Sequence, residues 1–273
     1  MAATEAHPVS SSKTQRPPAT TRARCLFASE WTKLRSVRST LWALAVAALT
    51  AVGGSLVIAL TAASSKASSG LPLDPVASIF FGWLEYPVLA VGALGVLAFT
   101  SECSTGQIRT TFSAVPWRPA VLGAKAGVVG AVVLLLGEVL AFASFFLSQA
   151  LLAGHQGGLS LFRSGELGSV LAGGLSLFVI AMVGLGLGAI IRNTAGALAA
   201  LPAVVYLPLL LLVLPSPWPD TIGKYTILMA AYQLVSLHPH PGLLSPALSL
   251  VVLVAWPAAL LVAGAVVTSR RDA

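Results

Sequence analysis

Charged side chains are scarce in this chain. Lysine, arginine, aspartate and glutamate together make up 9% of the 273 residues, whereas hydrophobic types make up 56%. A soluble domain carries about 25% charged residues, because water must solvate its surface. The scarcity excludes a water-soluble fold of this size, and the mean hydropathy of +0.89 agrees with that exclusion.

Sequence patterns of common enzymes are also missing. The chain has no phosphate-binding loop of the form G-x-x-x-x-G-K-[ST], no H-E-x-x-H zinc helix and no G-x-S-x-G nucleophile turn. Neither cysteine, Cys25 or Cys103, has a second cysteine or a histidine at metal-ligand spacing. We therefore expect no enzymatic activity, no metal and no cofactor on this chain.

Long apolar blocks dominate what is present. A membrane span needs ~20 apolar residues, because the hydrocarbon core is ~30 Å thick and a helix rises 1.5 Å per residue. Residues 1–23, rich in Ser, Thr, Ala and Pro, predict a disordered cytoplasmic tail. Residues 24–273 predict an all-α integral membrane domain. Its six expected spans cover about 41–63, 79–100, 128–151, 168–191, 195–214 and 245–267.

A helix is also predicted just before the first span. Phe27, Trp31 and Leu34 recur at helical spacing and form one apolar face. The other faces carry basic side chains, among them Lys33, Arg35 and Arg38. A basic amphipathic helix with aromatic anchors is typical of the membrane interface, so we expect it to lie there.

Lysine and arginine are distributed unequally between the connections. Only Lys66, Arg163 and Lys224 fall on one side of the predicted bundle, and all the others fall on the opposite side. Because cytoplasmic connections carry the excess of basic residues, both termini are predicted to be cytoplasmic. These basic residues lie between apolar blocks, which indicates contact with the lipid bilayer and not with nucleic acid. Both cysteines then face a reducing compartment, so no disulfide is expected.

The connection after the second span, Ser101–Pro119, has an unusual pattern. Ile108, Phe112 and Val115 recur at helical spacing, and Gly106 precedes them. Two prolines follow, so the pattern predicts a short, half-apolar cytoplasmic helix. Such a helix either provides a binding surface for a soluble partner or lies flat on the membrane surface.

The same segment resembles the permease subunits of ABC-2-type ABC transporters. Glu102, Gly106 and Pro116 match that family's pattern E-x-x-x-G-x(9,10)-P at the end of the second span. The run SECSTGQIRTTFSAVP is similar to the wording of the actinobacterial branch, as are SEWTKLRSVRST at residues 29–40 and the final SRRDA. The importer pattern separates Glu and Gly by six positions, whereas here they are four apart, which favours export.

The resemblance implies a role that composition does not. Such a chain is the membrane path of an ATP-driven exporter in the bacterial plasma membrane, paired with a second, identical or paralogous permease. Two copies of a separate ATPase subunit, which bind ATP and Mg²⁺, drive it through the short helix. The implied coupling residues are Glu102, Gly106, Ile108, Arg109, Phe112 and Pro116.

Two coupling residues allow specific hypotheses. In the family, the equivalent of Glu102 links the second span to the helix before the first. We therefore expect Glu102 to pair with Arg35 or Arg38. Arg109 either contacts the ATPase or follows the general excess of positive charge inside the cell.

Glu138 is the only carboxylate deep inside a predicted span. Burying its charge costs roughly 3 kcal/mol, so we expect it to face the bundle interior, a cavity or a partner. It either lines a translocation path or joins helices by hydrogen bonds to Ser144, Ser148 or Gln149.

Two other function classes fit the same helices. An ion-gradient-driven secondary transporter predicts several intramembrane charges and internal repeats, and neither is evident here. A non-transporting membrane scaffold or immunity protein needs no ATPase contact. The sequence does not indicate which substrate is moved.

Overall fold

The computed structural model describes residues 19–64, 83, 87–114, 117–152, 165–213, 215, 221–237 and 242–270. Within these ranges every regular element is helical. The α-helices are α1 (Ala19–Ser36), α2 (Arg38–Ser64), α4 (Pro87–Ser104), α5 (Gln107–Ala114), α6 (Arg118–Leu152), α7 (Glu166–Ile191), α8 (Thr194–Tyr206), α10 (Ile227–Val235) and α11 (Pro246–Arg270). Two 3₁₀ segments are η2 (Leu207–Val213) and η3 (Gly223–Tyr225).

Five of these helices are long and apolar enough to cross a membrane: α2, α4, α6, α7 and α11. The chain is therefore a multi-pass α-helical membrane protein, as its composition predicts. The fifth predicted span forms a different structure. Its α-helix, α8, has 13 residues and continues as the 3₁₀ segment η2. Pro208 is the second residue of η2 and has no N–H to donate to the carbonyl of Val204, so the α-helical hydrogen bonding is interrupted there.

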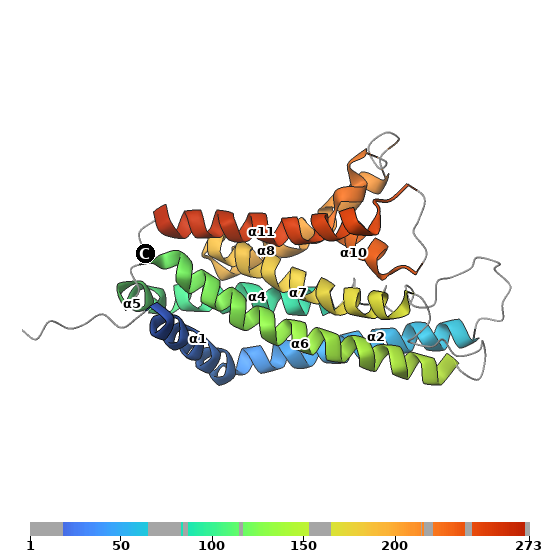
Figure 1. The fold of residues 1–273 in the computed structure, drawn as a ribbon, viewed down its shortest axis with the longest axis horizontal. Coiled ribbons are helices and arrows are strands. Elements are labelled where there is room, and N and C mark those ends of the chain that lie inside the picture. Colours follow the sequence, from blue (N-terminus) through green and yellow to red (C-terminus); the bar gives the residue numbers. More distant parts are fainter. Residues whose placement is uncertain are drawn as a thin grey trace, which may run out of the picture.

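Helix α7 lies at the centre of the bundle. It packs against α4, α6 and α11 (Figure 1), and most of its residues are buried. The outer helices α2 and α11 instead expose large apolar side chains, such as Leu49 and Val262. Exposed apolar faces on two long helices are what contact with lipid acyl chains requires.

Glycines bring the backbones of α4 and α7 into direct contact. A Cβ atom added at Gly184 would collide with the carbonyl of Gly92, and one added at Gly95 would collide with the carbonyl of Ala181. A Cβ atom at Gly188 would lie 3.0 Å from the carbonyl oxygen of Val96. Small residues allow such close helix packing where no water is present to drive association. The small residues of α7 thus serve packing within one chain.

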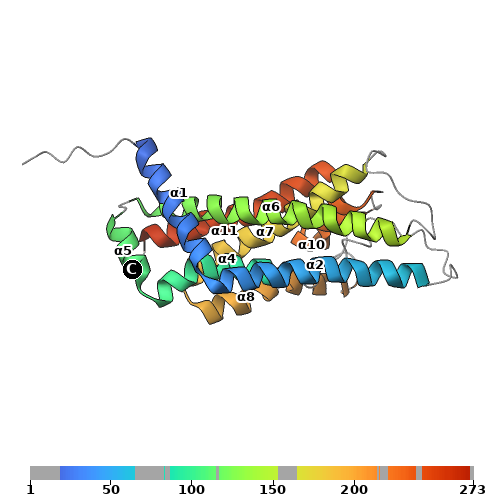
Figure 2. The same cartoon turned by 90° about the horizontal axis from the view of Figure 1, so that it is seen from below.

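The helix α1, the helix α5 and the C-terminal end of α11 lie together at one end of the bundle (Figure 1). We call this the basic end, because the charge pattern predicts it to be cytoplasmic. Helix α1 crosses α6 at an angle (Figure 2). It begins at Ala19, so residues 19–23, predicted to be disordered, are helical. Residues 1–18 of the predicted tail lie outside the described residues.

Two glycines provide a matched test of the packing. We expect Gly184→Ala to lower the free energy of unfolding by about 1–3 kcal/mol, because the new methyl group must push α4 away from α7. The control is Gly123→Ala on α6, where an added Cβ meets no atom within 4 Å. That change is expected to be neutral or stabilising by up to ~1 kcal/mol. Thermal unfolding in detergent measures both, and equal effects would contradict the packing argument.

Candidate functional site

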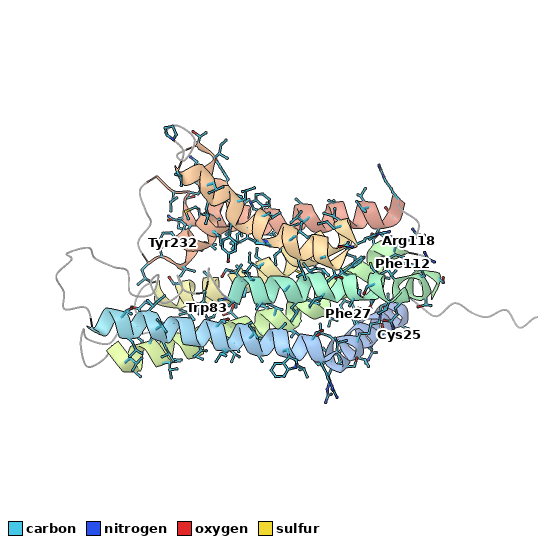
Figure 3. All side chains as sticks on the ribbon, turned by 180° about the vertical axis from the view of Figure 1, so that it is seen from behind. Cys25, Phe27, Trp83, Phe112, Arg118 and Tyr232 are labelled. Carbon is cyan, nitrogen blue, oxygen red and sulfur yellow. The ribbon has the colours of Figure 1, made fainter. Side chains whose placement is uncertain are left out.

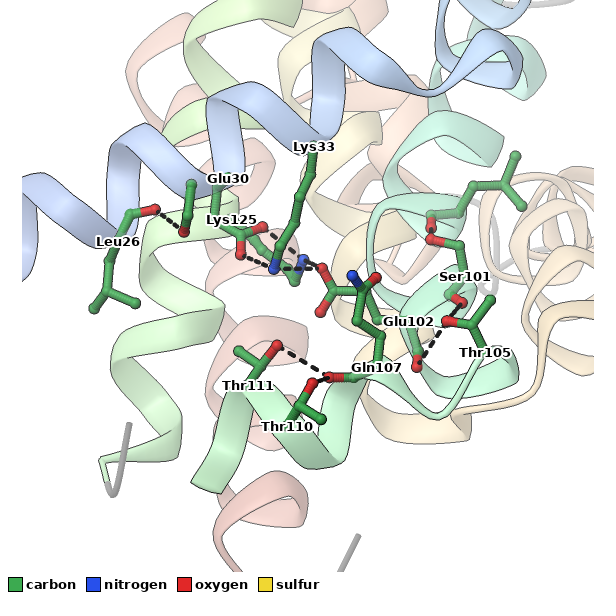
Figure 4. A network of polar contacts seen from close by, with 12 residues as sticks. Leu26, Glu30, Lys33, Ser101, Glu102, Thr105, Gln107, Thr110, Thr111 and Lys125 are labelled. Atoms are coloured by element: carbon green, nitrogen blue, oxygen red, sulfur yellow. Dashed lines mark hydrogen bonds and ion pairs between the residues drawn. The ribbon is translucent and has the colours of Figure 1, made fainter. Parts of the chain in front are cut away.

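Four charged side chains meet at the basic end (Figure 4). The Lys125 Nζ atom of α6 lies 2.6 Å from Glu30 Oε2 of α1 and 2.6 Å from Glu102 Oε1 of α4. Lys33 Nζ lies 2.8 Å from Glu30 Oε1 and 2.9 Å from Glu102 Oε1. We call Glu30, Lys33, Glu102 and Lys125 the ion-pair cluster. It joins three helices that are far apart in the sequence.

The ion-pair cluster is largely shielded from solvent. The side chains of Lys125 and Glu30 are 3% and 5% exposed, whereas that of Lys33 is 29% exposed. Two positive and two negative charges cancel, which offsets part of the large cost of removing each ion from water. Burial by itself lowers the pKa of Lys33, but hydrogen bonds and attraction from Glu30 and Glu102 outweigh it and raise that pKa. Lys33 is thus held in its charged form.

Local helix geometry sets up this arrangement. Glu30 and Lys33 are three residues apart, so they share one face of α1. Glu102 lies in the last turn of α4, and Gly106 follows with φ 71°, a conformation that favours glycine. The chain turns there and enters α5. The carboxylate that binds both lysines is therefore four residues from the turn into α5.

Helix α5 has one covered and one open face. The apolar side chains of Ile108 and Phe112 are buried. The Arg118 guanidinium lies over the Phe112 ring, 5.4 Å from its centroid (Figure 3), and donates a hydrogen bond to the carbonyl of Thr268 on α11. The open face consists of polar residues, namely Gln107, Arg109, Thr110 and Ser113. The predicted apolar stripe is thus used by this chain, and a partner would meet the polar face. Val115 and Pro116 lie outside the described residues.

The hypothesis for Glu102 is right about the helix and wrong about the residues. Glu102 does bind α1, but through Lys33, and Arg35 and Arg38 are exposed. The reason is the rotation of α1 about its axis, which turns Glu30 and Lys33 toward the bundle. On the opposite side of α1, Trp31 is 52% exposed, as an interfacial anchor requires.

Sequence reasoning missed Lys125 as a functional residue. It precedes the apolar block predicted at 128–151 and resembles an ordinary cytoplasmic loop cation. The helix α6 begins at Arg118, ten residues before the predicted start of the apolar block at residue 128. Lys125 is therefore part of a buried helical segment. The available signal was its neighbourhood, since Val121, Leu122 and Ala124 are apolar.

Glu138 faces the bundle interior, as expected. Its carboxyl group lies against Gly174 of α7, where a Cβ atom would collide with it. Among the described residues, Glu138 Oε2 has no hydrogen-bond partner, and neither do the hydroxyl groups of Ser144 and Ser148. The predicted hydrogen bonds from Glu138 to those serines are therefore not formed in the described part of the chain.

Metal-ligating residues do not cluster within the described ranges, where no group of three or more His, Cys, Asp or Glu residues occurs. Cys25 and Cys103 are both free thiols.

No family model matches the chain, and no curated protein matches it significantly.

Lys125→Met tests how strongly the ion-pair cluster depends on its buried ammonium. We expect a loss of about 3–5 kcal/mol of folding free energy, because two buried carboxylates would lose a cation. Lys33→Met should cost less, since water reaches Lys33. The triple variant Glu30→Gln, Glu102→Gln, Lys125→Met should recover much of the loss. Thermal unfolding in detergent measures all three, and a fully stable Lys125→Met protein would contradict the assignment.

Proposed function

We propose that this chain is the permease subunit of an ABC-2-type exporter in a bacterial plasma membrane. It forms a translocation path together with a second permease and is driven by two copies of a separate ATPase. The observation that carries the proposal is the position of the ion-pair cluster, which joins α4 to α1 and α6 five residues before α5 begins at Gln107.

This position gives α5 a mechanical role. Ile108 and Phe112 fix α5 to the bundle, and only Thr105 and Gly106 lie between the end of α4 and the start of α5. A displacement of α5 by a partner would therefore reach Glu102. Because Glu102 binds Lys33 and Lys125, the displacement would be shared by α1 and α6 as well as α4. An ATPase that moves on ATP binding needs such a connection to reshape a membrane path.

The course of the chain supports a sixth crossing made by α8 and η2. Helix α7 ends at the basic end, where Arg192 lies beside Arg109, and α11 also ends there (Figure 1). The chain must therefore cross once more between them. Thirteen α-helical and seven 3₁₀ residues rise about 33 Å in total, because a 3₁₀ segment rises ~2.0 Å per residue. That length matches a hydrocarbon core of ~30 Å.

The exposed face of α5 provides the test of the ATPase contact. We expect Thr110→Asp with Ser113→Asp to abolish co-purification of an ATPase that contains a phosphate-binding loop. Both hydroxyl groups are exposed and bind only carbonyls of their own helix, so the change should leave the fold intact. The measurement is a mild-detergent pull-down of the tagged protein from its native host, read by mass spectrometry and ATP hydrolysis.

The matched control is Ser36→Asp with Ser269→Asp. These serines are also exposed at the basic end and bind carbonyls of their own helices. The control should retain the ATPase. If no such ATPase accompanies the wild-type protein even after crosslinking, the exporter proposal fails. The gradient-driven transporter and the scaffold then become the leading alternatives.

Glu138 is proposed to line the translocation path. We expect Glu138→Leu to raise the unfolding temperature, because it removes a carboxyl group whose burial in a membrane costs roughly 3 kcal/mol. ATP turnover by the purified complex should fall several-fold, and Glu138→Gln should fall less because it keeps a polar group. A Leu variant with unchanged ATP turnover would remove Glu138 from the path.

A further inference from the structure

An open pocket of about 410 Å³ lies at the basic end, separate from the ion-pair cluster. None of the four cluster residues lines it. Its walls come from the end of α4, the start of α5 and the residue after α7. The lining residues are Cys103, Ser104, Thr105, Gly106, Ile108, Arg109 and Arg192.

The charge of the pocket selects an anion. Two arginines, Arg109 and Arg192, line it, and no lining residue is acidic. Paired guanidinium groups bind phosphate through charge-assisted hydrogen bonds, often two from one arginine.

The position of the pocket relative to the membrane indicates which kind of anion it binds. Cys103 and Ser104 are the last residues of the membrane-crossing helix α4, and Arg192 directly follows the membrane-crossing helix α7. Two spans thus end at the pocket. At that level the surroundings change from acyl chains to lipid headgroups, and basic pockets between helices bind anionic headgroups there.

The backbone at Arg192 adds a second observation. Its φ is 56°, in the left-handed region, and its N–H donates to the carbonyl of Gly188 at 2.9 Å. Glycine or asparagine is the usual residue at such a helix end. An arginine there has unfavourable backbone sterics, and its backbone is joined directly to Asn193, the N-cap of α8. The structure therefore keeps an arginine at a helix end where glycine or asparagine is usual.

We propose that this pocket binds the phosphate group of an anionic phospholipid headgroup. The two arginines hold the phosphate, and the acyl chains remain in the membrane beside the spans. The inference depends on the membrane location of the chain and not on the exporter proposal.

Native mass spectrometry of the delipidated full chain in detergent tests the site. The probes are phosphatidylglycerol and phosphatidylcholine with identical acyl chains, together with inorganic phosphate as a competitor. Wild type should bind one phosphatidylglycerol in preference to phosphatidylcholine. Arg109→Gln and Arg192→Asn should each weaken that binding about fivefold, and the double variant should lose the preference.

The variants are chosen so that folding does not obscure the result. Asparagine tolerates the left-handed backbone at position 192, and Arg109 is exposed on α5. If Arg192→Asn unfolds, Arg109→Gln alone decides the test. The matched control, Arg35→Gln with Arg38→Gln, removes two exposed charges at the same end and should keep the preference.

Three results would each overturn the proposal. One is the absence of any preference for phosphatidylglycerol in wild type. Another is a preference that survives the double variant or disappears equally in the control, since binding would then reflect general surface charge. The third is full displacement of the lipid by millimolar inorganic phosphate, which would make free phosphate the ligand.

Discussion

Lys125 cannot be buried alone, because an ammonium removed from water without counter-charges would destabilise the fold by several kcal/mol. Glu30 and Glu102 supply those charges from two other helices, and Lys33 restores neutrality at the solvent edge. The basic end therefore assembles as a unit. Helix α1 cannot detach without leaving Lys125 and Glu102 short of a partner. The orientation of α1 on the bundle, and with it the exposure of Trp31, follows from this electrostatic requirement.

The centre of the bundle is held by a different kind of contact. Helices α4 and α7 touch through backbone atoms at their glycines, so few side chains there can rearrange and the pair behaves as a stiff unit. Glu102 lies at the end of that pair and α5 follows directly. Under the exporter proposal, a displacement of Glu102 would act on both helices of this pair. Glu138 contacts Gly174 where α7 packs against α6.

The all-α membrane fold was predictable because a backbone that spans lipid must satisfy its hydrogen bonds internally, which a helix does. The length of each apolar block then indicates whether a helix can span the membrane. The short helix over Gln107–Ala114 and the turn at Gly106 followed from periodicity and glycine chemistry. The 3₁₀ segment η2 could not be predicted in this way, because hydropathy measures how apolar a segment is and not its backbone hydrogen bonding, in which Pro208 has no N–H to donate. The partners of Glu102 also escaped prediction, since they depend on how α1 is rotated about its axis.

The two faces of α5 divide its residues into two independent sets. Ile108 and Phe112 pack against the interior, so substituting them would lower the stability of the fold. Thr110 and Ser113 are exposed, so substituting them would change only the surface that a partner meets. Mutation can therefore rewrite the outer set without endangering the fold. Under the exporter proposal, paralogues that share this scaffold would be able to change partner through a few polar substitutions, and protein engineering would be able to direct the permease to a different ATPase in the same way.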